Sequence, residues 1–124
     1  MGRQTIGNGR YSLGRAIGQG GMATVHRGVQ AGAEGFQKPV AVKIIKISAE
    51  VDDDARAKLR RSLINEARLG ARLSHRNIVA VTDFGDEDGS YYMVMELVDG
   101  WTIHEILKRV EILPPSVAVE IMIE

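Results

Sequence analysis

A glycine-rich turn followed by a single lysine is the part of this sequence best suited to do chemistry. Residues 17–25 are Ile-Gly-Gln-Gly-Gly-Met-Ala-Thr-Val, and Lys43 closes an alternating apolar run that begins at Val40. Because glycine has no Cβ, the backbone of such a turn can lie against phosphate oxygens. A lysine projecting from a neighbouring strand supplies the counter-charge. The two features together predict a site for the phosphates of a nucleotide.

The segments around the turn decide which kind of phosphate site this is. A dinucleotide-binding turn needs a helix directly after its glycines, but residues 24–29 (Thr-Val-His-Arg-Gly-Val) favour a strand. A P-loop needs Gly-Lys-Ser/Thr, which the sequence lacks. A glycine turn between two antiparallel strands, with a lysine on the third strand, is the arrangement that remains. A plain hairpin with a flexible tip is the simpler alternative on the turn alone.

Lys43 lies in a strand that we expect to be largely buried, and a buried ammonium group is costly unless it is paired. Glu66, in the middle of a predicted helix, is the nearest sensible partner. An ion pair between the two would aim Lys43 at phosphate oxygens. The alternative is that Glu66 is a solvated carboxylate which pairs with a neighbouring arginine of its own helix.

Apolar periodicity defines the elements that must position these residues. Period-2 alternation favours strands over 11–17, 23–29, 40–47, 78–84 and 91–98, with a loop over 30–37 and a turn over 85–90. Helical spacing over 57–73, after an acidic helix-start segment over 48–54, favours a helix. Thr102 and Ser116 can cap two further helices, over 102–110 and 117–124. Hairpin-connected strands with one packed helix predict an α+β fold, a five-stranded antiparallel sheet carrying a single helix.

Composition limits the partners and the compartment. The chain has 124 residues, 44% of them apolar, which allows one domain or part of one. Sixteen basic and sixteen acidic residues leave no field of one sign to collect nucleic acid or anionic lipid. Cysteine is absent, so a thiolate metal site is excluded, and we expect a reducing, cytoplasmic compartment. No apolar run approaches about 18 residues, so no membrane segment is predicted, and residues 1–10 are expected to form a flexible lead-in.

At this point the motifs match a family. The chain resembles the N-terminal lobe of bacterial eukaryotic-type (Hanks-type) Ser/Thr protein kinases from about Tyr11 to its end. The resemblance rests on five segments: 18–25 (GQGGMATV), 41–43 (AVK), 65–68 (NEAR), 75–79 (HRNIV) and 92–100 (YMVMELVDG). Together they are specific, although Ala23 replaces a third glycine and Arg76 replaces a common proline.

The resemblance implies ATP as cofactor and a role for each matching residue. The phosphates would be covered by the turn, the adenine would be held by apolar side chains and by the backbone of a hinge, and Lys43, paired with Glu66, would hold the α- and β-phosphates. Met95 would be the gatekeeper behind the adenine, and residues 57–73 would form the movable regulatory helix. The implied ATP-binding residues are Ile17, Gly18, Gly20, Gly21, Ala23, Val25, Ala41, Lys43, Glu66, Met95, Glu96 and Val98.

Three segments depart from the family or imitate its other motifs. Asp83-Phe84-Gly85 resembles the magnesium-binding motif, but it precedes the hinge, so we expect it to end a strand and open a turn. His75-Arg76-Asn77 imitates the catalytic loop without its aspartate. We therefore expect His75 to anchor a loop by hydrogen-bonding to backbone groups. Gly70 is smaller than the apolar residue often found there, which predicts a loosely held helix.

The sequence therefore predicts an ATP-binding lobe with no catalytic residue and no metal site of its own. Residues 11–98 would form the lobe, and residues 99–124 would be the hinge exit and the start of a truncated second lobe. A longer intact protein, with Mg²⁺, would transfer the γ-phosphoryl group of ATP to protein Ser/Thr, whereas this chain alone would be inactive. Apolar Val117, Ile121 and Met122 predict self-association. A non-catalytic nucleotide-binding or partner-binding module is the alternative.

Overall fold

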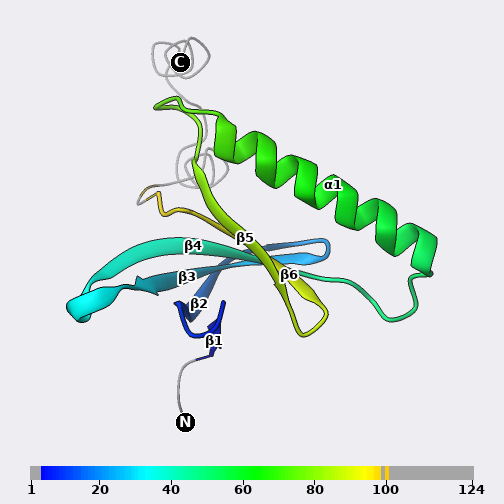
Figure 1. Cartoon of the computed structure of the whole chain (residues 1–124), viewed down its shortest axis with the longest axis horizontal. Helices are drawn as coiled ribbons and strands as arrows, with labels where there is room; N and C mark the ends of the chain where they lie inside the picture. Colours follow the sequence, from blue (N-terminus) through cyan, green and yellow to red (C-terminus); the bar gives the residue numbers. More distant parts are fainter. Residues whose placement is uncertain (1–3, 99, 101–124) are drawn as a thin grey trace, which may run out of the picture.

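The computed structural model describes residues 4–98 and Gly100 of the chain. One antiparallel sheet of six strands, with the order β1-β2-β3-β4-β6-β5, carries one long helix (Figure 1). The predicted helices over 102–110 and 117–124, and the apolar surface expected to cause self-association, lie outside the described residues. The elements are β1 (Thr5–Ile6), β2 (Tyr11–Gly20), β3 (Ala23–Ala31), the 3-10 helix η1 (Ala33–Gly35), β4 (Gln37–Lys46), α1 (Asp53–Arg72), β5 (Val81–Glu87) and β6 (Ser90–Glu96).

The sixth strand, β1, corrects the expected five-stranded sheet and lies inside the segment expected to be a flexible lead-in. Residues 7–9 all have positive φ angles, of 64°, 57° and 81°. This left-handed turn, built from glycine and asparagine, reverses the chain at low steric cost. Thr5 therefore pairs with Ser12 and Ile6 with Tyr11, and the Ile6 side chain is buried.

Register divides the sheet into two faces. Val81 of β5, which pairs with Met95, lies against Gly70 of α1, so Met95 belongs to the face that carries the helix. We call this the helix face and the opposite one the outer face. Because side chains alternate along a strand, Val94 points to the outer face. The main core cluster lies there, under β1 and the start of β2, and consists of Ile6, Tyr11, Leu13, Val40, Val42, Tyr92 and Val94.

Helix α1 begins at Asp53, inside the acidic segment that favours a helix start, because Asp52 caps it. The Asp52 Oδ1 atom accepts a hydrogen bond from the backbone N–H of Ala55 at 2.7 Å, which satisfies one of the unpaired donors of the first turn. Acidic Asp53 and Asp54 follow at the positive end of the helix dipole. The helix packs on the sheet through β5 and buries Leu63 and Ala67. In the described part of the chain, no helix is long and apolar enough to span a membrane.

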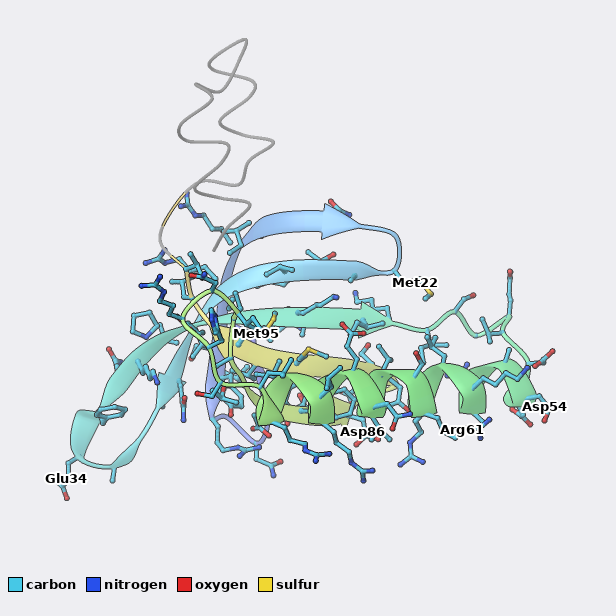
Figure 2. The ribbon with its side chains drawn as sticks, turned by 90° about the horizontal axis from the view of Figure 1, so that it is seen from above. Met22, Glu34, Asp54, Arg61, Asp86 and Met95 are labelled. Carbon is cyan, nitrogen blue, oxygen red and sulfur yellow. The ribbon has the colours of Figure 1, made fainter. Side chains whose placement is uncertain are left out.

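The connections between strands are shorter than predicted. Strand β5 continues through Glu87, so the expected turn over 85–90 shrinks to Asp88 and Gly89, which both have positive φ angles. Two such residues form the hairpin turn whose twist matches antiparallel strands. The loop expected over 30–37 likewise shrinks to Gly32, η1 and Phe36, and Figure 2 shows Glu34 at the tip of this hairpin. Pro39 pairs with Val29 before the pairing of β4 with β6 begins, so it lies at a local sheet edge, where proline is tolerated.

A polar network ties the start of β2 to β5 on the outer face. The Tyr11 hydroxyl donates to Asp83 Oδ2 at 2.5 Å, and the Arg10 guanidinium lies 3.4 Å from the same oxygen. Burial, followed by the hydrogen bond to Asp83, raises the pKa of Tyr11 to about 12. The network therefore stabilises the fold while Tyr11 keeps its proton.

Replacing Tyr11 by phenylalanine is expected to lower the free energy of unfolding by about 1–2 kcal/mol, because one hydrogen bond to a carboxylate is lost. A raised folded-state pKa means that the stabilisation is fully present below pH 10 and is lost as pH rises from 10 towards 12. Urea titrations across this range should show a steeper loss for the wild type than for the variant. Parallel pH curves for the two proteins would contradict this assignment.

Candidate functional site

The glycine turn is the tip of the β2–β3 hairpin. Gly20 pairs with Ala23, leaving Gly21 (φ 54°) and Met22 at the turn. The backbone N–H of Lys46 donates to the Met22 carbonyl at 3.2 Å, so the tip is tied to the end of β4. A Cβ atom added at Gly20 or Gly21 would meet no heavy atom within 4 Å. The space beside both glycines is therefore open, as a phosphate cradle requires.

Strand pairing brings the predicted nucleotide residues of three strands to one face. Val25 pairs with Lys43, Lys43 pairs with Met93, and Ala41 pairs with Met95. Because paired residues of an antiparallel sheet project to the same side, Val25, Ala41, Lys43 and Met95 all belong to the helix face. Ala41 is buried, whereas the other three are half-buried. They form an apolar wall that carries one cation near the glycine turn.

The expected ion pair between Lys43 and Glu66 is absent. Within the described residues, the ion pair formed is Arg10 with Asp83, and Glu66 is exposed to solvent. The physical reason is the sheet order: α1 packs on β5, which is separated from β4 by β6. Lys43 is also only half-buried rather than largely buried, and its ammonium group forms no ion pair within the described residues.

The end of β6 and the residues after it contain the predicted hinge. The backbone N–H of Glu96 donates to the Ala80 carbonyl at 3.0 Å, and the Glu96 carboxylate accepts from the Ala80 N–H at 3.4 Å. The backbone N–H of Glu96 is therefore already bonded within the lobe. Val98 lies beyond the strand and is 61% exposed, and Ile17 of β2 is 46% exposed.

Asp83-Phe84-Gly85 is a structural segment of β5. It lies inside the strand rather than at its end, contrary to our expectation. Besides its contacts with Tyr11 and Arg10, the Asp83 carboxylate accepts a hydrogen bond from the Phe84 N–H at 2.8 Å. Asp83 pairs with Val94, so it belongs to the outer face, away from Lys43. No group of three metal-ligating side chains occurs among the described residues.

His75 anchors a loop, as predicted. Its Nδ1 atom accepts a hydrogen bond from the Asn77 N–H at 3.0 Å, and its carbonyl accepts from the Ile78 N–H at 3.1 Å. The segment after α1 is therefore held by its own backbone and by one imidazole ring. This arrangement gives His75 a structural role.

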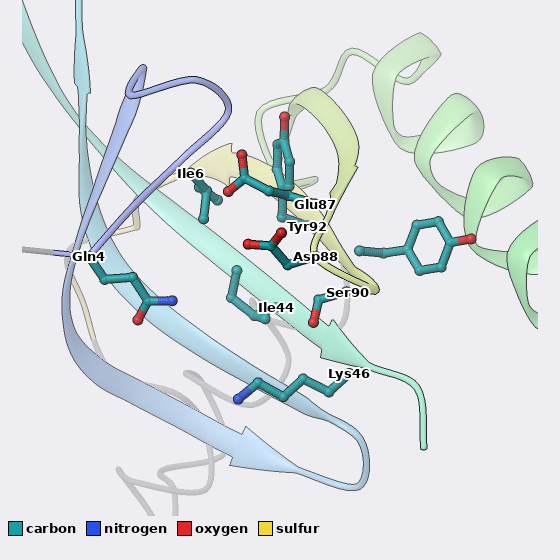
Figure 3. Close-up of a pocket in the computed structure, with 9 residues that line it drawn as sticks. Gln4, Ile6, Ile44, Lys46, Glu87, Asp88, Ser90 and Tyr92 are labelled. Carbon is teal, nitrogen blue, oxygen red and sulfur yellow. The ribbon is translucent and has the colours of Figure 1, made fainter. Parts of the chain in front are cut away.

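A separate hollow of about 250 Å³ lies against the outer face (Figure 3). Its floor contains Ile6, Ile44 and Tyr92, and Lys46, Glu87 and Asp88 are among its lining residues. Ile44 and Lys46 alternate with Lys43 and Ile45 along β4, so they project away from the helix face. This hollow is therefore not part of the predicted nucleotide site.

The comparison with protein families decides the assignment. The protein kinase domain model matches residues 11–124. This chain belongs to the protein kinase family. Among curated kinases it is 38% identical over 117 residues to the serine/threonine-protein kinase PrkC of Bacillus subtilis, and 37% identical over 119 residues to the serine/threonine-protein kinase PknB of Mycobacterium leprae. These matches cover 93% and 91% of this chain, but only 17% and 18% of the two relatives.

Solved structures agree with the kinase fold. The chain superposes with a TM-score of 0.70, at 27% identity, on the crystal structure of Rad53 1-466 in complex with AMP-PNP, over 92% of this chain and 28% of that one. The apo form of PpkA-294 gives a TM-score of 0.66 at 25% identity, over 89% of this chain and 47% of that one. An antiparallel sheet with one packed helix is thus the N-terminal lobe of a kinase, with six strands in this chain.

The prediction that Gly70 leaves the helix of this kinase lobe loosely held was wrong. A Cβ atom at Gly70 would lie 2.6 Å from Val81 Cγ2. The small residue therefore lets α1 approach β5 closely, rather than leaving the helix loosely held. A glycine within a helix costs stability relative to alanine, so a glycine on the sheet-facing side of a helix was the available signal for close packing.

Replacing Gly70 by alanine is expected to lower the free energy of unfolding by about 1–2 kcal/mol, the usual cost of overpacking. The gain in helix propensity, about 1 kcal/mol, would otherwise stabilise the lobe. Urea denaturation of the single variant and of Gly70→Ala with Val81→Ala measures both effects, and the second substitution should recover stability. A more stable single variant would show that α1 is free to move away from β5.

Proposed function

We propose that this chain is the ATP-binding lobe of a Ser/Thr protein kinase, and that the whole protein transfers the γ-phosphoryl group of ATP to protein Ser/Thr. The chain spans less than a fifth of the length of its curated relatives, so activity, substrate and partners are proposed for the longer protein. The single observation that carries the proposal is the convergence of Val25, Ala41, Lys43 and Met95 on the helix face beside an open glycine turn.

The residues present fit ATP. Gly18, Gly20, Gly21 and the backbone to Ala23 would cover the phosphates, because no Cβ occupies the space beside the turn. Val25 and Ala41 would pack on the adenine with Ile17 at the edge and Met95 behind it, while the Glu96 carbonyl and the Val98 N–H would bond to the adenine edge. Lys43 would hold the α- and β-phosphates by charge. The bound AMP-PNP of the Rad53 structure supports a nucleotide in this fold.

Phosphoryl transfer needs in-line positioning of a hydroxyl group and neutralisation of charge by Mg²⁺. Residues 11–98 supply the adenine and phosphate wall, and we propose that residues 99–124 begin the second lobe. Pairing of Lys43 with Glu66 would require α1 to move towards β4, so the described arrangement corresponds to an unpaired form of the lobe. The absence of cysteine and the need for ATP support a cytoplasmic location.

Two measurements test the proposal separately. Competition against a fluorescent ATP analogue should show that the chain binds ATP, with Gly20→Ala weakening binding while the melting temperature stays unchanged. A reading frame that extends beyond Glu124 should phosphorylate a protein substrate, whereas the 124-residue chain should not. Failure of the chain to bind ATP would contradict the assigned site. Activity of the short chain, lost in Lys43→Met, would contradict its predicted inactivity.

The alternative, a non-catalytic partner-binding module, is favoured by no observation. Two results together would favour this module over a kinase lobe. The reading frame would end soon after Glu124, and the folded chain would bind no nucleotide. Self-association through Val117, Ile121 and Met122 is a further proposal, which light scattering over a range of concentrations tests.

A further inference from the structure

The outward face of α1 carries a line of four basic side chains, broken once at its middle. Lys58, Arg61, Arg68 and Arg72 follow one another at intervals of three, seven and four residues, and we call them the basic stripe. On a helix these intervals keep successive side chains on one side. All four are exposed, and Figure 2 shows Arg61 on the side of α1 that points away from the sheet. Asn65 fills the gap between Arg61 and Arg68.

None of the four stripe cations has a partner within the described residues. The ion pair formed there is Arg10 with Asp83, and of the arginines on α1 it is Arg56, outside the stripe, that donates to a backbone carbonyl, that of Ser48. Among the acidic residues of α1, Asp54 lies on the same line one turn before Lys58, whereas Asp53 and Glu66 lie to one side of the stripe. Beyond that first position, Arg61, Arg68 and Arg72 have no acidic neighbour on the line, in a chain whose formal net charge is zero.

Helix stability does not explain this arrangement. Cations stabilise a helix only near its C-terminus, and Arg72 alone lies in the last turn. Lys58 and Arg61 occupy the half of α1 nearer its positive end. Arg68 and Arg72, four residues apart, repel each other. An anionic ligand that lay along the stripe would relieve this repulsion.

We propose that the basic stripe binds an extended acidic peptide segment of a partner protein. From Lys58 to Arg72 the stripe is about 21 Å long at the usual rise of a helix. An extended peptide of roughly seven residues spans the same length. The guanidinium groups of the three arginines can each donate two hydrogen bonds to one carboxylate. The proposed site is independent of the nucleotide face, because it lies on the opposite side of α1.

The surroundings of the stripe favour a narrow ligand over a membrane. Asp52, Asp53 and Asp54 are exposed at one end of α1, and Asp86 and Asp88 are exposed at the end of the neighbouring hairpin of β5 and β6. A flat anionic bilayer that contacted the helix would also approach these carboxylates, which it would repel. A single extended chain confined to the stretch from Lys58 to Arg72 ends one turn short of Asp54.

Fluorescence anisotropy of a labelled glutamate heptapeptide with the 124-residue chain tests the proposal. We expect saturable binding that weakens as salt is added, and no binding of a glutamine heptapeptide. Arg61→Glu with Arg68→Glu should weaken binding by about tenfold or more, because two attractions become repulsions. The matched control, Arg15→Glu with Lys38→Glu, makes the same change in net charge on exposed strand positions and should leave binding within about threefold.

Two further measurements keep the result decisive. Arg61→Gln with Arg68→Gln removes the charges without reversing them, and should also weaken binding if thermal melts show an unchanged fold. Co-sedimentation with vesicles of phosphatidylcholine and phosphatidylserine tests the lipid alternative. Equal losses in the stripe and control variants would overturn the site. Stripe-dependent binding to vesicles that the glutamate heptapeptide does not displace would assign the surface to a membrane and overturn the peptide.

Discussion

Lys43→Met is expected to weaken ATP binding by about tenfold to a hundredfold, since one charge-assisted contact to phosphate contributes about 1.5–3 kcal/mol. The same substitution should change the free energy of unfolding by no more than about 0.5 kcal/mol. The reason is that Lys43 is half-buried and forms no ion pair within the described residues, so its removal leaves no buried carboxylate without a partner. Isothermal titration with ATP and urea denaturation measure the two effects.

Lys46→Met is the matched control on the same strand. Lys46 lies three residues after Lys43, so it projects to the outer face, and it is exposed. The Lys46→Met substitution removes the same charge at a position that is also near the glycine turn. It should leave ATP affinity unchanged. Equal losses of affinity in the two variants would show that ATP binding depends on the net charge of the chain alone. That result would refute a specific role for Lys43.

Gly85→Ala is expected to lower the free energy of unfolding by about 3 kcal/mol, at the upper end of the range for overpacking. A Cβ atom at Gly85 would overlap the ring of Tyr92, approaching Cζ to 2.5 Å. Tyr92 is only 6% exposed within the outer-face core, so its ring has little room to move. Thermal unfolding should show a fall in melting temperature of about 10 °C or more.

Two comparisons establish the cause. Gly20→Ala, also on a strand, places its methyl group in open space and should leave stability nearly unchanged. Tyr92→Leu combined with Gly85→Ala should be less destabilising than the sum of the two single substitutions, because the shorter side chain removes the overlap. Additive losses in this double-mutant cycle would mean that the alanine acts through something other than the Tyr92 ring.

Most of the fold follows from local pattern, and the misses have a common origin. Alternation identified the five longer strands, and helical spacing with Asp52 to Asp54 located α1, because each signal lies within one element. Strand β1 was missed because two residues are too short for periodicity to show. The Gly7-Asn8-Gly9 turn was the available signal, since a left-handed turn beside an apolar residue indicates a hairpin.

The nucleotide face was predictable for the same reason. Alternation along β3, β4 and β6 decides which side each residue faces, and the pairing of Val25 with Lys43 and of Ala41 with Met95 in the structure puts these residues on one face. The rejection of Asp83-Phe84-Gly85 as a metal motif likewise came from its position along the chain. Its bonds to Tyr11 and Arg10, however, join residues more than seventy positions apart.

By itself, the sequence indicated the kinase family, the order of the five longer strands and the helix, and candidate residues for the phosphate and adenine wall. Only the tertiary structure decided that Lys43 and Glu66 stand apart, that Gly70 seats α1 against Val81, and that Ile6 closes the outer-face core. The physical reason is that periodicity encodes the direction of a side chain within its element. The separation between two elements depends on how all the side chains between them pack.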